Sequence, residues 1–292
     1  MSFQDALSLC AAEIEALLDR LMPLDGAAAP RVAEAMRYAA LGQGKRLRPF
    51  LVVESSRLFG VPRQQALRVG AALECVHCYS LVHDDLPAMD DDDLRRGKPT
   101  AHKAFDEATA ILAGDALLTL AFEILSDAAT HPDPQVRLNL ISRLAQAAGK
   151  AGMVGGQMLD IEAETRATSS LADITRIQSL KTGALFRFAC EAGAILAGAD
   201  PAPLRQYADN IGLAFQIADD ILDVESTPHA LGKATQKDSA KGKATFVDLL
   251  GLEQAKTRAA KLTDEAIGAL SVYGTRAAIL ADAARYVVTR RK

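Results

Sequence analysis

Apolar residues recur every three or four positions along most of the chain, beginning with Leu7, Ala11, Ile14 and Leu18. This spacing places apolar side chains on one face of an α-helix, whereas the alternation with a period of two that is typical of strands is hard to find. Valine and isoleucine do not cluster into short runs, and tryptophan is absent. The pattern predicts an all-α protein.

Proline, glycine and polar stretches divide the pattern into segments of roughly 20 to 30 residues, which is long against a mean helix of about 12. The expected breaks lie at residues 23–30, 42–49, 60–62, 87–99, 131–134, 200–203 and 225–242. Long helices joined by short connections predict a large helical bundle. No Ser/Gly/Pro-rich linker interrupts the 292 residues, so we expect a single domain over residues 1–292.

The composition, 49% hydrophobic and 24% charged residues, is that of a soluble globular protein. Lysine and arginine number 33 against 37 acidic residues, a formal net charge of −4. A nucleic-acid-binding protein usually needs a clustered basic field, and this chain has only short basic islands. Nucleic acid is therefore excluded as an expected partner.

No stretch of about 18 residues is free of charge, which argues against a membrane-spanning helix. The first 20 residues carry Asp5, Glu13, Glu15 and Asp19, so they are interpreted as an amphipathic helix instead of a signal peptide. Four cysteines are too few for a disulfide scaffold, and we expect a cytoplasmic protein.

Cys75 and Cys78 form a Cys-x-x-Cys pattern beside His77 and His83. A zinc or redox site is one interpretation of such a pattern. No second pair of thiols is present to complete a tetrahedral zinc site. Buried, unreactive cysteines are the favoured interpretation.

Six carboxylates crowd into residues 84–93, directly after the apolar helical segment 71–82. Most acidic runs are solvated loops. Here Asp84 and Asp85 end a segment that is too apolar for a surface helix, so the pair is expected to project from the core. Because like charges this close repel one another, a cation is expected beside them.

A second acidic cluster follows an apolar helical pattern at residues 215–223, where Asp219, Asp220 and Asp223 stand near Gln216. Asp219 and Asp223 share one helical face. Buried, unpaired carboxylates are costly, so basic side chains or metal ions must face them. Magnesium fits best, because it binds through a few carboxylates, keeps some waters and completes its shell with phosphate oxygens. The spacing does not match a calcium-binding EF-hand loop.

Basic islands alternate with the acidic clusters, and this alternation indicates that both face phosphate groups. They are residues 44–49, residues 94–100, the Lys181-Thr182-Gly183 stretch, Lys233 and Lys243. Each alone would more often be a solvated patch. His77 lies about 10 Å before Asp84 along a helix and on the same side, although a core histidine is an equal alternative. The Walker A, Gly-x-Gly-x-x-Gly and Gly-x-Ser-x-Gly motifs are absent.

Taken together, the motifs resemble those of the trans-polyprenyl diphosphate synthases, and within that family the bacterial kind that makes farnesyl diphosphate. The matching stretches are residues 44–49, 84–100, 113–116, 156–160, 181–183 and 216–223, with Lys233 and Lys243. They run in the family's order over nearly the whole chain. The resemblance implies a helical bundle around a deep central cavity, assembled as a homodimer.

The resemblance also implies the roles of the site residues. Magnesium would be held against an allylic diphosphate by Asp84, Asp85, Asp90, Asp219, Asp220 and Asp223. The same diphosphate would be contacted by Arg95, Lys181, Lys233 and Lys243. Isopentenyl diphosphate would be held by Lys45, Arg48, His77 and Arg96. The allylic cation would be stabilised by Thr182, Gln216 and the backbone carbonyl near Lys181, where Gly183 would loosen the helix.

The implied reaction condenses isopentenyl diphosphate with dimethylallyl and then geranyl diphosphate, through magnesium-assisted ionisation, condensation and elimination. Ionisation needs charge neutralised on the leaving diphosphate, which metal ions and fixed cations supply. One proton is then lost to the departing diphosphate. No protein base is required, in agreement with the absence of a Ser/His/Asp or Cys/His arrangement.

Product length is expected to depend on Tyr79 and Ser80, just before the first acidic cluster. Tyr79 lies about 7 to 8 Å down the helix from Asp84, where its ring would stop growth early. The inserted Pro87-Ala88 pair resembles that of farnesyl synthases, although some geranylgeranyl synthases share it. Farnesyl diphosphate is the expected product. The basic end at residues 289–292 is expected to fray, with closure over the diphosphate as the alternative.

Two other functions are kept open. A terpene cyclase uses the same type of acidic motif, but Lys45, Arg48 and Arg96 would then have no second diphosphate to bind. A non-catalytic subunit of a heteromeric prenyl synthase would keep the fold, but such subunits typically lose one acidic motif. Both motifs are intact here.

Overall fold

The computed structural model describes residues 2–42, 44–164, 170–225 and 244–290. The first four helices are α1 (Phe3–Leu21), α2 (Pro30–Ala40), α3 (Leu47–Arg57) and α4 (Arg63–Asp84). After a short hairpin come α5 (Ala101–Ala104), α6 (Glu107–Ser126), α7 (Pro134–Ala148), α8 (Met153–Glu164) and α9 (Leu171–Gln178). The rest are a π-helix (Ser179–Gly183), α10 (Ala184–Ala197), α11 (Ala202–Glu225), α14 (Phe246–Leu250), α15 (Leu252–Ala269), a 3₁₀ helix (Ser271–Ala277) and α16 (Ala278–Thr289). The all-α prediction is confirmed.

The helix ends follow the punctuation in the sequence. The Asp106 side chain caps α6 by accepting a hydrogen bond of 2.8 Å from the backbone N–H of Thr109. Pro30 and Pro134 occupy the first helical positions of α2 and α7, where a missing N–H costs nothing. Gly198 ends α10 in the left-handed conformation with φ of 64°.

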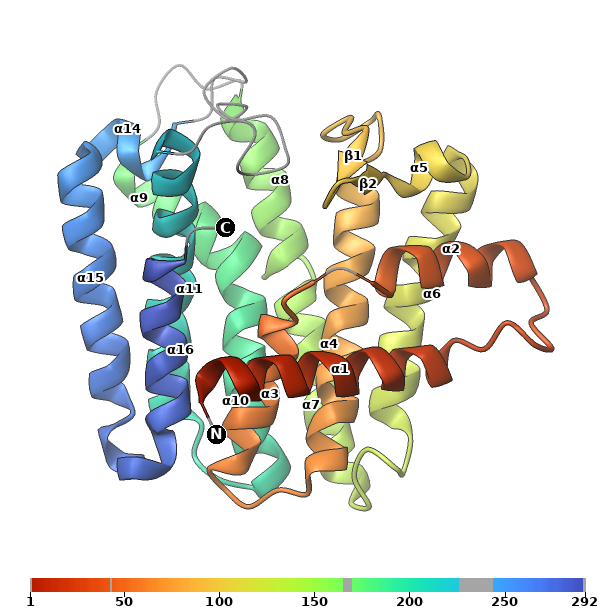
Figure 1. Cartoon of the computed structure of the whole chain (residues 1–292), viewed down its shortest axis with the longest axis horizontal. Helices are drawn as coiled ribbons and strands as arrows, with labels where there is room; N and C mark the ends of the chain where they lie inside the picture. The colour runs from red at the N-terminus through yellow and green to blue at the C-terminus, as the bar shows by residue number, and fades with distance from the viewer. Residues whose placement is uncertain (1, 43, 165–169, 226–243, 291–292) are drawn as a thin grey trace.

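The core lies where α3, α4 and α10 meet, and Figure 1 shows these helices in the middle of the bundle, with α1 crossing in front of them. Phe50, Leu73, Val76 and Phe186 are fully buried there. Full burial of a side chain of this kind contributes about 1.5 to 3 kcal/mol. The N-terminal segment is an amphipathic helix, as predicted, and buries Ile14 against the same core.

A short antiparallel hairpin follows the first acidic cluster, within the region expected to be a loop. Its strands are β1 (Leu94–Arg95) and β2 (Lys98–Pro99). The turn residues Arg96 and Gly97 both have positive φ, 54° and 78°, as two-residue hairpin turns require. Two-residue strands are too short to produce a recognisable alternation, which is why the sequence pattern missed them.

The chain between Pro134 and Ala197 is divided more finely than the sequence pattern predicts. A turn at residues 149–152 separates α7 from α8. A Cβ atom on Gly152 would lie 2.1 Å from the Ala147 carbonyl oxygen, so only glycine fits this turn. The expected irregularity near Lys181 is present as the π-helix, a form found frequently at functional sites.

Among the described residues, α6 is the one helix whose length and composition would allow it to cross a membrane. It packs against α2, α4 and α7 within the bundle. Ala113, Leu117 and Ala121 of this helix are fully buried. One face of α6 is therefore part of the core, whereas Ile111 and Leu112 of the same helix are exposed.

Candidate active site

A cavity of about 550 Å³ opens between α4, α8 and the π-helix. Its apolar lining comes mainly from Leu81, Leu86, Ile111, Met153, Val154, Met158, Ile161 and Leu185. Its polar lining includes Arg48, His77, Ser80, Asp84, Gln157, Lys181 and Thr182. An apolar cavity with a few converging polar groups is the usual form of a small-molecule site. Predicted site residues that lie more than 130 positions apart in the chain therefore share one cavity.

The first acidic cluster lies at the end of α4 and folds back on that end. The backbone N–H of Asp90 donates to the Asp84 carbonyl at 2.8 Å, and the N–H of Asp92 donates to the Asp85 carbonyl at 3.2 Å. The Asp85 side chain is buried and accepts a hydrogen bond of 2.9 Å from Nε of Arg95. This folding holds the backbone of residues 90–92 against the end of α4.

Asp84 is the member of this cluster that lines the cavity. Burial raises the pKa of its carboxyl to about 6; Lys181 opposes the shift and Asp90 adds to it. Burial also raises the pKa of Asp85, although Arg95 opposes that shift. Keeping the buried Asp84 carboxylate charged therefore costs free energy, and a bound cation would remove that cost.

The second acidic cluster lies on α11, one turn beyond Gln216. Asp219 Oδ1 is 2.6 Å from Nη2 of Arg290, and Asp220 Oδ2 accepts a hydrogen bond of 2.8 Å from the backbone N–H of Phe246. The charge on Asp219 also acts on Arg48, which lines the cavity. The second cluster thus lies in the electrostatic range of the cavity's basic residues.

The oxygen donors of both clusters suit magnesium by their chemistry. Within the part of the chain that the structure describes, no group of three or more acidic, histidine or cysteine side chains is arranged to hold a metal ion. Magnesium is typically bound by one or two carboxylates together with waters and substrate phosphates, so a complete protein cage is not required. The cavity-lining Asp84, with its raised pKa, is the carboxylate that fits this role best.

The basic side of the cavity is defined here as Arg48 and His77, which line it, together with Arg96, whose charge acts on both of them. Nη1 of Arg48 lies 3.4 Å from Nε2 of His77. Burial, followed by the charges of Arg48 and Arg96, holds the pKa of His77 well below its usual value. His77 is therefore a neutral hydrogen-bonding group beside two cations, and it lines the cavity.

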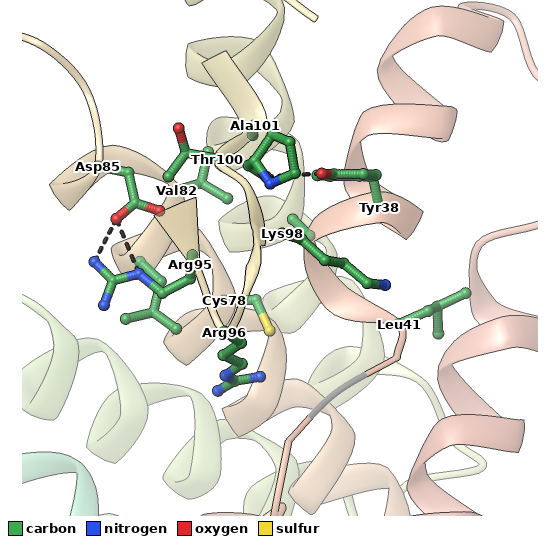
Figure 2. Close-up of a pocket in the computed structure, with 13 residues that line it drawn as sticks. Tyr38, Leu41, Cys78, Val82, Asp85, Arg95, Arg96, Lys98, Thr100 and Ala101 are labelled. Carbon is green, nitrogen blue, oxygen red and sulfur yellow. Dashed lines mark hydrogen bonds and ion pairs between the residues drawn. The ribbon is translucent and has the colours of Figure 1, made fainter. Parts of the chain in front are cut away.

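Arg96 reaches back from the hairpin to the loop that precedes α3. A Cβ atom on Gly44 would lie 2.7 Å from Nη1 of Arg96, so the glycine leaves room for the guanidinium. Figure 2 shows Asp85 paired with Arg95 beside the hairpin, while Arg96 extends away from that pair. Lys45, in the same loop, lies over the Tyr286 ring at 5.4 Å. The two adjacent arginines thus have different neighbours: Arg95 pairs with Asp85, and Arg96 lies beside Gly44.

Lys181 lies on the π-helix and points toward α8. Its Nζ atom is 2.7 Å from Asp160 Oδ2. A Cβ atom on Gly156 would lie 2.2 Å from the Lys181 backbone nitrogen, so α8 and the π-helix approach backbone to backbone. Gln157, the next residue, lines the same cavity. The Gly-Gln-x-x-Asp stretch of residues 156–160 therefore supports Lys181.

Thr182 connects the π-helix to α11. Its hydroxyl donates to Gln216 Oε1 at 3.0 Å. The side chains of Tyr79 and Ser80 line the cavity from α4, and Tyr79 is only 7% exposed. The structure thus brings together the predicted cation-stabilising pair and the predicted chain-length residues.

Other predicted features fall elsewhere. Lys233 and Lys243 lie outside the described residues. The basic island at residues 44–49 does not act as a unit, because Arg46 is buried and pairs with Glu74 at 2.5 Å and Glu15 at 2.7 Å.

All four cysteines are buried and free. Burial raises the pKa of the Cys78 thiol to about 12, which supports the interpretation that the cysteines are unreactive.

The expectation of a frayed basic end is wrong at Arg290. Its side chain is 6% exposed, lies over the Phe215 ring at 3.7 Å and donates to the Phe215 carbonyl at 3.2 Å. Together with the contact to Asp219, these interactions bind the end of α16 to α11. The sequence analysis names this residue within the basic end but predicts neither its burial nor its contact with Asp219.

The family model for polyprenyl synthetase matches residues 29–279 of the chain. The chain belongs to this family. It is 48% identical to the farnesyl diphosphate synthase of Escherichia coli (strain K12), with 100% of both chains covered. It is 46% identical to the farnesyl diphosphate synthase of Geobacillus stearothermophilus, over 85% of this chain and 84% of the relative. The resemblance predicted from the motifs is confirmed.

The solved structures agree with the sequence relatives. A crystal structure of an FPP/GFPP synthase from Zymomonas mobilis in its apo form has a TM-score of 0.90 and 52% identity, covering 98% of this chain and 99% of that chain. A geranyltransferase from Legionella pneumophila has a TM-score of 0.89 and 34% identity, with 99% and 97% covered. The helical bundle of this chain is therefore the fold of these enzymes.

Proposed function

We propose that this protein is a farnesyl diphosphate synthase that adds isopentenyl diphosphate first to dimethylallyl and then to geranyl diphosphate. The observation that carries this proposal is one apolar cavity lined both by Asp84 and by Arg48 with neutral His77 beside it. A cavity with a metal-binding carboxylate and a separate anion-binding side suits the joining of two diphosphates. The farnesyl diphosphate synthases among its relatives support the same assignment.

The allylic diphosphate would be held at the acidic side. Magnesium, when bound, would neutralise charge on the diphosphate as its carbon–oxygen bond breaks. Its ligands would be Asp84, Asp85 and Asp90 from the first cluster and Asp219, Asp220 and Asp223 from the second. Additional diphosphate contacts would come from Arg95, Lys181, Lys233 and Lys243. These fixed cations stabilise the leaving group without any proton transfer.

The allylic cation would form beside the π-helix. Gln216 Oε1 and the hydroxyl of Thr182 are held together by their 3.0 Å hydrogen bond, so both oxygens are positioned before the charge develops. The irregular hydrogen bonding of the π-helix makes the backbone carbonyl near Lys181 a third oxygen dipole. The surrounding apolar side chains exclude water that would otherwise capture the cation.

Isopentenyl diphosphate would bind at the basic side. Its diphosphate would contact Lys45, Arg48 and Arg96, with neutral His77 as a hydrogen-bonding group. The double bond would then attack the allylic cation, and one proton would pass to the released diphosphate. The clustering of buried positive charge on this side supports the assignment.

The product is proposed to be farnesyl diphosphate because the bulky Tyr79 lines the cavity together with Ser80. Replacing the ring by a methyl group should deepen the cavity by the depth of one aromatic side chain. We expect Tyr79→Ala to shift the main product to geranylgeranyl diphosphate, measured by the chain length of dephosphorylated products. An unchanged product would exclude Tyr79 as the floor.

The active form is proposed to be a cytoplasmic homodimer of one domain over residues 1–292. Ile111, Leu112, Val154 and Met158 on α6 and α8 are 44 to 53% exposed, and all but Leu112 also line the cavity. A second copy of the chain bound over this apolar surface would close the cavity on the side of α6 and α8. The four buried free thiols support a reducing compartment.

The proposed function is tested by incubating the purified protein with magnesium, isopentenyl diphosphate and, in separate reactions, dimethylallyl, geranyl or farnesyl diphosphate. We expect ten- and fifteen-carbon products from the first, fifteen-carbon products from the second and almost none from the third. Turnover of an allylic diphosphate without isopentenyl diphosphate would indicate a terpene cyclase instead. Absence of product with every starter would indicate a non-catalytic subunit.

A further inference from the structure

His83 occupies a tightly restricted position between α4 and α6. Its Nε2 atom lies 3.1 Å from the Ile111 carbonyl oxygen, to which the Nε2–H donates. A Cβ atom on Gly114 would lie 2.1 Å from Nε2 and 2.5 Å from Cδ2 of the imidazole. A glycine at position 114 is therefore required for the ring to lie where it does.

The other side of the same imidazole faces the proposed floor of the cavity. The rings of His83 and Tyr79 meet edge to face, with centroids 5.7 Å apart and planes at 76°. Both side chains line the cavity. Edge-to-face contact is a favourable arrangement of two aromatic rings, so His83 restricts the orientation of Tyr79.

We propose that His83, supported by Gly114, is a positioning residue that fixes the Tyr79 ring and thereby limits product length. This inference rests on the proposed function. Gly114 of α6 supports the imidazole, the imidazole supports the phenol ring, and that ring closes the cavity. Product length would then depend on the spacing of α4 and α6 as well as on the residue at position 79.

The arrangement predicts opposite effects for two substitutions. In His83→Ala the Tyr79 ring can turn into the vacated space, so the cavity deepens and products lengthen. In Gly114→Ala the new methyl group pushes the imidazole off α6 and toward the cavity it lines, so products shorten. A pocket discriminates by about tenfold or more for small changes in hydrophobic volume, so product ratios should move by about tenfold.

The experiment measures product chain lengths from isopentenyl and dimethylallyl diphosphate at low conversion, with thermal unfolding recorded for each variant. We expect His83→Ala to raise the ratio of twenty- to fifteen-carbon products about tenfold, and Gly114→Ala to raise the ratio of ten- to fifteen-carbon products about tenfold. His83→Gln keeps an amide donor for the Ile111 carbonyl and should give an intermediate ratio. The control Gly268→Ala, at a helical glycine with no atom within 4 Å of its Cβ position, should keep the wild-type ratio.

The double variant Gly114→Ala/His83→Ala separates positioning from a general disturbance of α6. Without an imidazole to push, the methyl group should have no effect, and the double variant should give the long products of His83→Ala. Short products from the double variant would overturn the proposal, as would wild-type ratios in folded His83→Ala. If Gly114→Ala does not fold, the proposal is tested by the ratio of twenty- to fifteen-carbon products. This ratio should fall from His83→Ala through His83→Gln to wild type, and any other order would overturn the proposal. A wild-type protein that makes no prenyl product would instead refute the proposed function.

Discussion

The basic and acidic sides of the cavity differ in how far the protein alone assembles them. On the basic side, Arg48 and His77 already lie 3.4 Å apart, and Arg96 fits against Gly44. On the acidic side, Asp85 and Asp219 are paired with cations of the protein itself, Arg95 and Arg290. The basic groups therefore already lie together, whereas Asp85 and Asp219 must exchange partners before they can bind a metal.

This difference has an energetic origin. Like charges that lie together away from water raise the free energy of the empty site, and an anion relieves that cost. Carboxylates that are paired with arginine are already stabilised by the opposite charge, so a metal ion must compete with the arginine. We infer that isopentenyl diphosphate binds to a preorganised site and that the allylic diphosphate and magnesium rearrange theirs.

The largest effect is expected from Asp84→Asn on the acidic side. Losing a metal-binding carboxylate removes several kcal/mol of charge stabilisation from the ionisation step, so kcat/KM should fall by about 10³-fold or more. Thermal stability should not fall, because burial raises the pKa of Asp84 and its charge is therefore a cost to the folded state. The matched control is Asp91→Asn, an exposed residue of the same loop that should keep its activity. Full activity of Asp84→Asn would contradict the proposed metal site.

A smaller and more selective effect is expected from Arg48→Gln on the basic side. Charge-assisted hydrogen bonds are worth about 1.5 to 3 kcal/mol, so the KM for isopentenyl diphosphate should rise about 10- to 100-fold. The KM for geranyl diphosphate should change far less. Arg31→Gln, which breaks an exposed ion pair with Asp106, is the control. Equal increases in both KM values would mean that the two sides are not separate sites.

How far each side could be predicted from the sequence depends on the residue. The aspartates of residues 84–93 and 219–223 stand out because carboxylates after apolar helices need a cation. Arg46 and Arg48 cannot be told apart by type or spacing. Their difference arises from the left-handed backbone at Arg46, with φ of 51°, and from the buried acid Glu74.

The features that sequence reasoning missed depend on contacts between distant segments. Arg290 meets Asp219 across 71 residues, and nothing near Arg290 in the sequence indicates that its side chain is buried. The hairpin turn that separates Arg95 from Arg96 is too short for any periodicity. The helices themselves were predictable because a period of 3.6 residues is repeated over many turns.

The pH dependence of ligand binding should also differ between the acidic and the basic side of the cavity. Burial raises the pKa of Asp84 to about 6, so protonation below that pH removes its negative charge, and magnesium-dependent binding should weaken about tenfold per pH unit. The same shift means that Asp84 destabilises the folded protein progressively as the pH rises from about 4 to 6. Comparison with Asp84→Asn isolates this residue from titration of the substrate. An identical pH dependence in the variant would contradict the assignment.

The smallest effect is expected from Arg290→Gln, which removes the competitor at Asp219. We expect the affinity of the substrate-free protein for Mn²⁺, measured by electron paramagnetic resonance, to increase by a few-fold. Loss of the buried guanidinium contacts should lower stability by about 1 to 2 kcal/mol. Arg285→Gln, on the same helix with an exposed ion pair to Asp282, is the control. Unchanged or weaker Mn²⁺ binding would show that Arg290 does not compete with the metal.

The central claim, that one side is preorganised and the other depends on metal, is tested most directly by calorimetric binding with and without magnesium. The ligands are isopentenyl diphosphate and a non-ionisable geranyl thiolodiphosphate. We predict that chelation of magnesium leaves the Kd of isopentenyl diphosphate within about threefold and weakens the geranyl analogue by about 100-fold or more, the loss of a few kcal/mol of charge stabilisation. Equal dependence of both ligands on magnesium, or independence of both, would contradict the account.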